Sequence, residues 1–271
     1  MEQINLHKIL LDKNPKLSKI IPRLIINAAG RIIQVKKLNH ILLNYSHLKP
    51  YEFLTECINY MGVEYKLHNT HNIPDNKKIL FASNHPLGGL DGMTLALALH
   101  NTTQKEVMFV VNDILMNLKP LAPIFVPVNK HGRQSNEYLK QHTAAYEGEN
   151  HVITFPAGLC SRLIDGEIQD TPWKTNFIAK AKQYQRTIVP IYTDGTNSKS
   201  FYRIAQWRKK LGIKANLEMI LLPKEMFNKK HKIINIYIGK PIEIDETRTA
   251  KEWCDIIRTA AYDMKPAVTT K

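Results

Sequence analysis

The sequence predicts an α/β fold in which a mixed, largely parallel sheet is flanked by helices and preceded by a basic amphipathic helical segment. Two observations support this prediction. From Tyr51 onward, short apolar runs alternate with longer stretches of helical periodicity, a pattern typical of α/β units. Polar residues suited to a binding site follow several of these runs, as they do at the carboxyl ends of strands in open α/β sheets. We expect one domain over residues 51–271, after an N-terminal segment over residues 1–50.

The N-terminal segment is basic and amphipathic. Between Pro15 and Tyr45, isoleucines and leucines are interspersed with lysines and arginines, and no acidic residue occurs. Such helices either lie in a lipid interface or pack an apolar face on a core, and the sequence leaves both interpretations open. Pro22 and Gly30 predict breaks, so we expect several short helices rather than one long one.

The remaining elements follow from hydrophobic periodicity. Short runs rich in apolar residues predict strands at 78–82, 107–111, 124–128, 151–155, 187–192, 217–222 and 232–238. Longer periodic stretches predict helices at 91–100, 134–147, 173–185 and 249–263. The last helix opens with Thr249 and Glu252, the spacing of a capping box.

Charge and cysteine content restrict the partners and the setting. The 271 residues include 38 Lys and Arg against 24 Asp and Glu, a net charge of +14. This charge favours nucleic acid, anionic lipid, a phosphorylated substrate or an acidic carrier protein as partner. The three cysteines include no close pair, which indicates neither a disulfide framework nor a zinc site and favours a reducing cytosol. No secretory signal or uncharged stretch of about 18 residues is present, so we expect no membrane-spanning segment.

A basic stretch between Lys199 and Lys232 has three interpretations. It could hold anionic lipid, dock an acidic acyl carrier protein, or form an ordinary solvated surface. The sequence does not choose among them.

Four segments that follow predicted strands carry the candidate chemistry. They are Asn84–Asp91, Asn129–Arg133, Pro156–Arg162 and Asp194–Asn197. Because strand ends in an open α/β sheet line one cleft, we expect these segments to meet.

The first segment holds an imidazole and a carboxylate. His85 and Asp91 flank Gly88 and Gly89, and Pro86 keeps His85 out of the helical region, at the exit of the strand. A neutral histidine can take a proton from a hydroxyl at cytoplasmic pH, and Asp91 can accept a hydrogen bond from its other ring nitrogen. The alternatives are a histidine satisfied within its loop and an aspartate that caps the next helix; the second is compatible with the orienting role.

The order and content of the four segments resemble the glycerolipid acyltransferase superfamily, which includes lysophosphatidic acid acyltransferases. The first block of that family is Asn-His followed by four residues and Asp, and five residues separate His85 from Asp91 here. The second block corresponds to the strand and loop of 124–133. The third, usually Phe-Pro-Glu-Gly-Thr-Arg-Ser, corresponds to 155–162, and the fourth to 188–192.

Two departures from the family pattern define a divergent branch. Gly88 and Gly89 can absorb the extra residue of the first block, because glycine accepts turn conformations that strain other residues. Ala157 stands where the family has glutamate, which removes a carboxylate on the acceptor side. The acceptor therefore need not be lysophosphatidate, and the missing carboxylate slightly favours a lyso-amino-acid lipid.

The resemblance implies an O-acyltransferase that moves a fatty acyl group from an acyl carrier protein or coenzyme A thioester to the hydroxyl of a lysolipid. The acceptor would be a lyso-amino-acid lipid, of the ornithine or glycine type, or 1-acyl-glycerol-3-phosphate. His85 would be the base and Asp91 its orienter. The residues expected to bind substrate are Asn84, Arg133, Gly158, Ser161 and Arg162. No metal, cofactor or nucleic acid is expected, and the protein would lie on the inner, cytoplasmic face of the cell membrane.

Two other functions remain open from the residues alone. A non-catalytic basic protein bound to anionic lipid or nucleic acid would explain the charge without chemistry. An acyl thioesterase would use water in place of the alcohol. Cys160 suggests a thiol nucleophile, but its segment lacks the second glycine of a nucleophile elbow, which favours a small buried residue.

Overall fold

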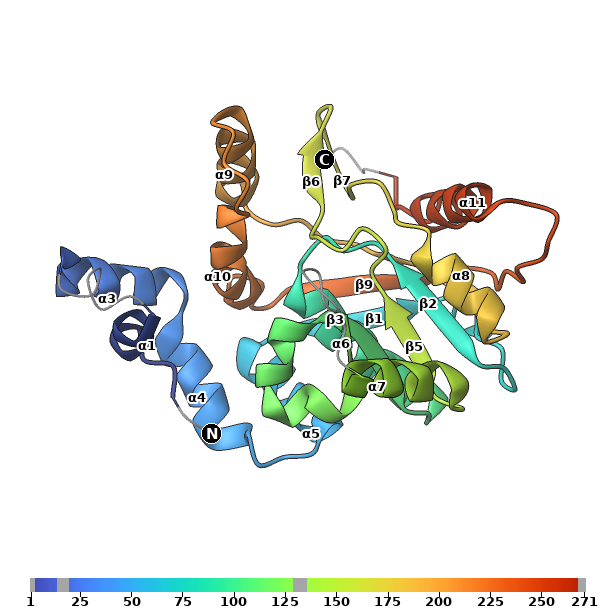
Figure 1. Ribbon diagram of the computed structural model, residues 1–271, viewed down its shortest axis with the longest axis horizontal. Coiled ribbons are helices and arrows are strands. Elements are labelled where there is room, and N and C mark those ends of the chain that lie inside the picture. Colours follow the sequence, from blue (N-terminus) through green and yellow to red (C-terminus); the bar gives the residue numbers. More distant parts are fainter. Residues whose placement is uncertain (1–2, 14–19, 129–135, 268–271) are drawn as a thin grey trace.

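A seven-stranded sheet forms the centre of the protein (Figure 1). The computed structural model describes residues 3–13, 20–128 and 136–267. The order across the sheet is β1-β9-β8-β2-β5-β3-β4. The strands are β1 (Glu64–His68), β2 (Ile79–Ser83), β3 (Val107–Asn112), β4 (Phe125–Val128), β5 (His151–Thr154), β8 (Thr187–Thr193) and β9 (Ile233–Ile238). The strands from β8 to β4 are parallel, whereas β9 pairs antiparallel with β8 and parallel with β1. The predicted mixed, largely parallel sheet is confirmed.

The central strands are buried on both faces. Every residue of β2 and β8 is buried, which explains why both read as continuous apolar runs rather than alternating ones. Along β2, Ile79 and Phe81 join one core cluster, whereas Leu80 and Ala82 join another. The sheet therefore separates two hydrophobic layers.

Helices cover both layers. On one face lie α5 (Pro50–Met61) and α6 (Gly89–Thr103), whose apolar residues pack with Ile79 and Phe81. The other face is covered by α7 (Asn136–Glu147), α8 (Asn176–Gln183) and α11 (Ala250–Tyr262). Three 3-10 turns lie in the connections between strands. η1 (Thr70–Asn72) lies between β1 and β2, and η2 (Asp113–Asn117) and η3 (Lys119–Ile124) lie between β3 and β4. The predicted helices at 91–100, 134–147, 173–185 and 249–263 are confirmed, including the capping box of Thr249 and Glu252.

The strand predicted at 217–222 is wrong. This run forms the 3-10 helix η4 (Leu217–Leu221), followed by α10 (Leu222–Phe227). Glu218 lies inside the run and is drawn into the interior by ion pairs with Arg162 and Arg208. A sheet partner is absent for this stretch within the described residues, so its apolar side chains pack on α9 (Lys199–Lys210) instead.

Several elements were not expected from the sequence. They are β1, α5, α9 and the hairpin of β6 (Arg162–Ile164) and β7 (Glu167–Gln169). β1 is an edge strand of partly exposed, polar residues, so it lacks the apolar signature of the central strands.

The N-terminal segment forms α1 (Leu6–Lys13), α3 (Arg23–Ile32) and α4 (Val35–Tyr45), which lie beside the sheet domain (Figure 1, blue). Pro22 precedes the first turn of α3, as predicted, but Gly30 stays helical and the second break falls at Gln34, whose φ is 60°.

α4 buries Ile41 and packs on α5, whereas Leu24 of α3 is 78 % exposed. Within the described residues, no helix combines the length and apolarity needed to cross a bilayer. The division at residue 50 and a lipid contact of α3 stay predictions.

Candidate active site

The site lies where parallel strands end at one edge of the sheet. Asn84 and His85 follow β2, Phe155 follows β5 and Asp194 follows β8. The imidazole of His85 stacks on the ring of Phe155, with centroids 4.1 Å apart, and the backbone N–H of Ser161 donates to the carbonyl of His85 at 2.8 Å. The side-chain amide of Asn197 donates to the carbonyl of Pro86 at 3.0 Å, so the first, third and fourth predicted segments meet. The second segment, with Arg133, lies outside the described residues.

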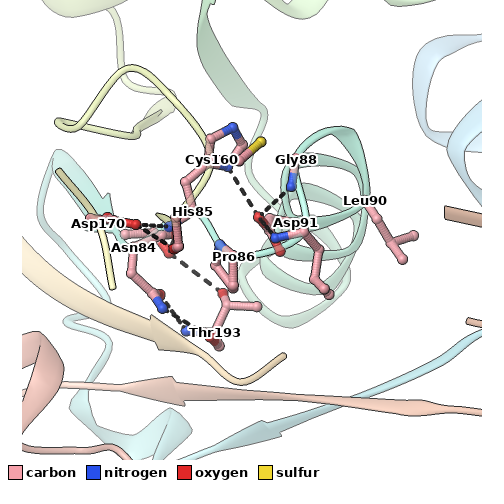
Figure 2. Close-up of polar contacts among 12 residues, drawn as sticks. Asn84, His85, Pro86, Gly88, Leu90, Asp91, Cys160, Asp170 and Thr193 are labelled. Atoms are coloured by element: carbon pink, nitrogen blue, oxygen red, sulfur yellow. Dashed lines mark hydrogen bonds and ion pairs between the residues drawn. The ribbon is translucent and has the colours of Figure 1, made fainter. Parts of the chain in front are cut away.

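His85 faces Asp91 directly. Nδ1 of His85 lies 3.1 Å from Oδ2 of Asp91 (Figure 2). The same oxygen accepts hydrogen bonds from the backbone N–H groups of Leu87 at 2.7 Å and Gly88 at 3.0 Å, the two residues that precede α6. Asp91 thus caps the helix and faces the imidazole at once. Because Nδ1 faces the carboxylate, Nε2 is the ring nitrogen left for a substrate, and its role as a base stays a prediction.

Charge and burial shift the pKa values of His85 and Asp91. Burial lowers the pKa of His85, but the neighbouring Cys160 sulfur and the Asp91 carboxylate outweigh it and raise that pKa above its ordinary value. Burial raises the pKa of Asp91, and the contacts with His85 and the Leu87 N–H oppose that rise. These contacts favour the protonated form of the imidazole, which is the form that proton transfer from a substrate would produce.

Gly88 accommodates the additional residue of the first block. Its φ is 74°, and a Cβ there would stand 3.0 Å from both the Cys160 sulfur and the Leu222 side chain. Both facts favour glycine, because other residues are strained at positive φ and have no room here. Cys160 itself is completely buried beside the imidazole (Figure 2), in agreement with the prediction of a small buried residue.

Asn84 joins the ends of β2 and β8. Its side-chain amide donates to the carbonyl of Thr193 at 2.9 Å and accepts from the N–H of Thr193 at 2.7 Å. This pair of hydrogen bonds is buried and fixes the strand end from which His85 projects. A direct contact of Asn84 with substrate stays a prediction.

Arg162 is held by the protein. Its guanidinium lies 2.6 Å from Oε1 of Glu218, a completely buried carboxylate, and donates to the carbonyl of Cys160 at 2.5 Å. A substrate anion at Arg162 would have to compete with Glu218. Gly158 stands at φ 67°, and the position of a Cβ there is 3.7 Å from the Lys174 ammonium. Substrate binding by Gly158 and Arg162 stays a prediction.

Asp170 is a carboxylate of the site that the sequence analysis missed. One oxygen accepts from the backbone N–H of His85 at 3.2 Å and from the hydroxyl of Ser161 at 2.6 Å, and the other accepts from the indole N–H of Trp173 at 2.9 Å. Burial raises the pKa of Asp170, against the hydrogen bonds that it accepts. The hydroxyl of Ser161 is therefore bonded to Asp170 in this structure, and a contact of Ser161 with substrate stays a prediction.

A turn signal could have indicated that Asp170 returns to the site. Asp165 and Gly166 both have positive φ and form a two-residue hairpin loop between the paired residues Ile164 and Glu167. Asp-Gly between short apolar runs is a strong hairpin signal. The hairpin reverses the chain after the third block and brings Asp170 back beside His85.

We expect Asp170→Asn to reduce kcat by about tenfold, because it loosens the backbone of His85 and misplaces the imidazole. The amide cannot accept from all three donors, so at least one buried donor loses its partner. Steady-state kinetics and thermal unfolding of the same preparation test this expectation. Trp173→Phe is the matched control: it removes one donor to Asp170 without touching His85, so it should lower stability but not kcat. Equal kcat values for Asp170→Asn and the wild type would limit Asp170 to a structural role.

Comparison with known proteins identifies the family. A family model described as acyltransferase matches residues 8–270. The chain belongs to this acyltransferase family. The protein is an acyltransferase, and the resemblance inferred from the four blocks is confirmed. Its relatives include a lyso-glycine lipid O-acyltransferase of Phocaeicola vulgatus, 39 % identical over 96 % of this chain and 95 % of the relative.

A second relative bears the same name. It is the lyso-glycine lipid O-acyltransferase of Bacteroides thetaiotaomicron, 38 % identical over 96 % of this chain and 97 % of its own length. A solved structure, the 1-acyl-sn-glycerophosphate acyltransferase of Thermotoga maritima, is similar with a TM-score of 0.47 and 13 % identity, over 89 % of this chain and 97 % of that one.

Proposed function

We propose that this acyltransferase transfers a fatty acyl group from an acyl carrier protein or coenzyme A thioester to the hydroxyl of a lyso-glycine lipid. The observation that carries the proposal is the contact of His85 with Asp91, 3.1 Å between Nδ1 and Oδ2, at the strand ends of an acyltransferase-family fold. This contact supports the role of His85 as the base, with Nε2 as the nitrogen that takes the proton of the substrate hydroxyl.

The proposed reaction needs one base and no covalent enzyme intermediate. Nε2 of His85 takes the proton of the acceptor hydroxyl while its oxygen attacks the thioester carbonyl. The new C–O bond forms, the C–S bond breaks, and the imidazolium returns its proton to the leaving thiolate. Asp91 stabilises the imidazolium between these steps. The reaction requires no metal.

Two observations support a glycine-type head group. Both curated relatives, at 39 % and 38 % identity, are named for lyso-glycine lipid. Ala157 replaces the glutamate of the common third block and is itself buried, so the site lacks that carboxylate on the acceptor side. A lyso-ornithine lipid and 1-acyl-glycerol-3-phosphate are the acceptors against which this proposal is tested.

We place the enzyme at the inner, cytoplasmic face of the cell membrane as a peripheral protein. The net charge of +14 attracts an anionic surface, and the exposed apolar side chains Ile20, Leu24 and Ile25 can enter the lipid interface. The acceptor is an amphiphile that resides in that interface, so contact of the N-terminal segment with lipid would bring enzyme and substrate together.

The test is a panel of acceptors with each donor. Purified protein is incubated with acyl-acyl carrier protein or acyl-coenzyme A and with lyso-glycine lipid, lyso-ornithine lipid, lysophosphatidate or no acceptor, and products are identified by mass spectrometry. We expect a diacylated product from lyso-glycine lipid. Preferential acylation of another lysolipid would overturn the head group. Fatty acid released without acceptor would indicate a thioesterase, and salt-dependent binding to nucleic acid or anionic lipid without any transfer would favour a non-catalytic basic protein.

A further inference from the structure

α9 carries an exposed apolar stripe. Ile204, Trp207 and Leu211 follow a spacing of three and four residues and therefore lie on one face of the helix and its end. Trp207 is 68 % exposed and Leu211 is 65 % exposed. With Ile213 and Leu217 they line a groove of about 460 Å³. In Figure 1, α9 projects away from the sheet domain. Within the part of the chain that the structure describes, the stripe does not pack on the core. We name these five apolar residues the α9 surface.

The border of the α9 surface is basic. Lys199, Arg203 and Lys210 are exposed and recur at helical spacing beside the apolar stripe. No acidic residue occurs from Gly195 to Leu217, so nothing within this stretch neutralises them. An exposed stripe of Trp, Leu and Ile bordered by Lys and Arg complements a partner that is both apolar and anionic.

α9 is also connected to the active site, through Arg208 at the edge of the same groove and through its buried aromatic residues. Arg208 pairs with Oε2 of Glu218 at 2.6 Å, and the other oxygen of Glu218 pairs with Arg162 of the third block at 2.6 Å. Phe201 and Tyr202 pack with Cys160, the residue beside the imidazole of His85. α9 is thus joined by buried contacts to Cys160 and Arg162, close to His85.

We propose that the α9 surface docks on the anionic face of a lipid bilayer, with Trp207 and Leu211 in the boundary between head groups and acyl chains. Interfacial helices have this composition: aromatic and aliphatic residues on one face, lysines and arginines beside it. An acidic carrier protein would satisfy the basic border, but the strongly exposed centre of the surface is indole and aliphatic, which suits acyl chains better. Docking does not depend on the proposed acceptor; only its effect on turnover rests on the proposed function.

Trp207 allows a local test on the full chain. Trp173 and Trp253 are only 5 % and 7 % exposed, so a change in tryptophan emission on binding reports Trp207. The protein is mixed with vesicles of phosphatidylcholine alone or with phosphatidylglycerol, carrying brominated acyl chains. We expect a blue shift and quenching with the anionic vesicles, and neither in Trp207→Phe. An unchanged emission of bound wild-type protein would overturn the proposal, because the N-terminal segment contains no tryptophan that could mimic the signal.

A charge-reversed pair tests the basic border. Arg203→Glu with Lys210→Glu should weaken binding to the anionic vesicles by at least about tenfold, since each basic residue near such a surface contributes about 1 kcal/mol. Lys182→Glu with Lys251→Glu makes the same charge change on α8 and α11, which lie away from α9 (Figure 1), and should reduce binding far less. Transfer to lysolipid in vesicles should fall only in the first variant, and transfer to lysolipid dispersed in detergent in neither.

Two results would contradict the α9 assignment. Equal losses of vesicle binding in the two charge variants would show that net charge, not the α9 surface, determines binding. A shift of the Trp207 emission with acyl carrier protein and none with anionic vesicles would assign the surface to a protein partner. Both readouts are independent of turnover, so they hold even if the acceptor proves to be a different lysolipid.

Discussion

Replacing His85 with alanine is expected to reduce acyl transfer by about 10²-fold or more, because loss of a positioned general base ordinarily has that effect. In the wild type, Nδ1 faces Asp91, and we propose that Nε2 takes the proton of the acceptor hydroxyl. Without the imidazole, the hydroxyl must lose its proton to water while its oxygen attacks. The measurement is the initial rate of product formation from thioester and lysolipid, with the folded fraction checked by circular dichroism and thermal unfolding.

His68→Ala is the matched control for this substitution. His68 is also a partly buried imidazole stacked on an aromatic ring, that of Tyr237 at 4.5 Å, and it accepts or donates one side-chain hydrogen bond with Asn235. His68 is the last residue of β1, which runs antiparallel to β2. It therefore lies at the edge of the sheet opposite to the edge that carries His85. This variant should lose similar packing and retain transfer. If His85→Ala kept more than a few per cent of the rate, histidine would have no role as the base.

The sequence predicted the central strands and the contact of His85 with Asp91, for a physical reason. β2 and β8 are buried on both faces, so their composition is nearly all apolar and unambiguous. His85 and Asp91 are close in the chain, and Pro86 with the glycines restricts how the loop between them can fold. Local chemistry thus determines local geometry here.

Long-range partners could not be predicted in the same way. Arg162 was expected at a substrate anion, but its guanidinium pairs with Glu218, 56 residues further along the chain and inside a run assigned to a strand. Nothing local in either segment reveals this pairing, because both the turn of the third block and the apolar run are compatible with other partners. Asp170 is a similar case, since only the folded hairpin of β6 and β7 brings it to the backbone of His85.

Asp91→Asn is expected to reduce transfer by about 10²-fold or more and to shift the pH dependence of what remains. The amide oxygen can still accept from the N–H groups of Leu87 and Gly88, so the first turn of α6 should persist. It carries no charge, however, and cannot stabilise the imidazolium that forms during transfer or hold the imidazole in the required tautomer.

The direction of the pH shift follows from the electrostatics of the pair. The Asp91 carboxylate is one of the groups that raise the pKa of His85 against burial, and the base must be neutral to work. In the wild type, kcat/KM should therefore fall as the pH drops through a pKa above the ordinary value near 6.5. In Asp91→Asn the fall of kcat/KM should occur at lower pH, because the carboxylate no longer opposes the lowering of the His85 pKa by burial. A pH profile of kcat/KM for both proteins measures this. A reduced rate with kcat/KM falling at the same pH as in the wild type would mean that Asp91 orients His85 without raising its pKa. An unchanged rate would leave Asp91 as a helix cap alone.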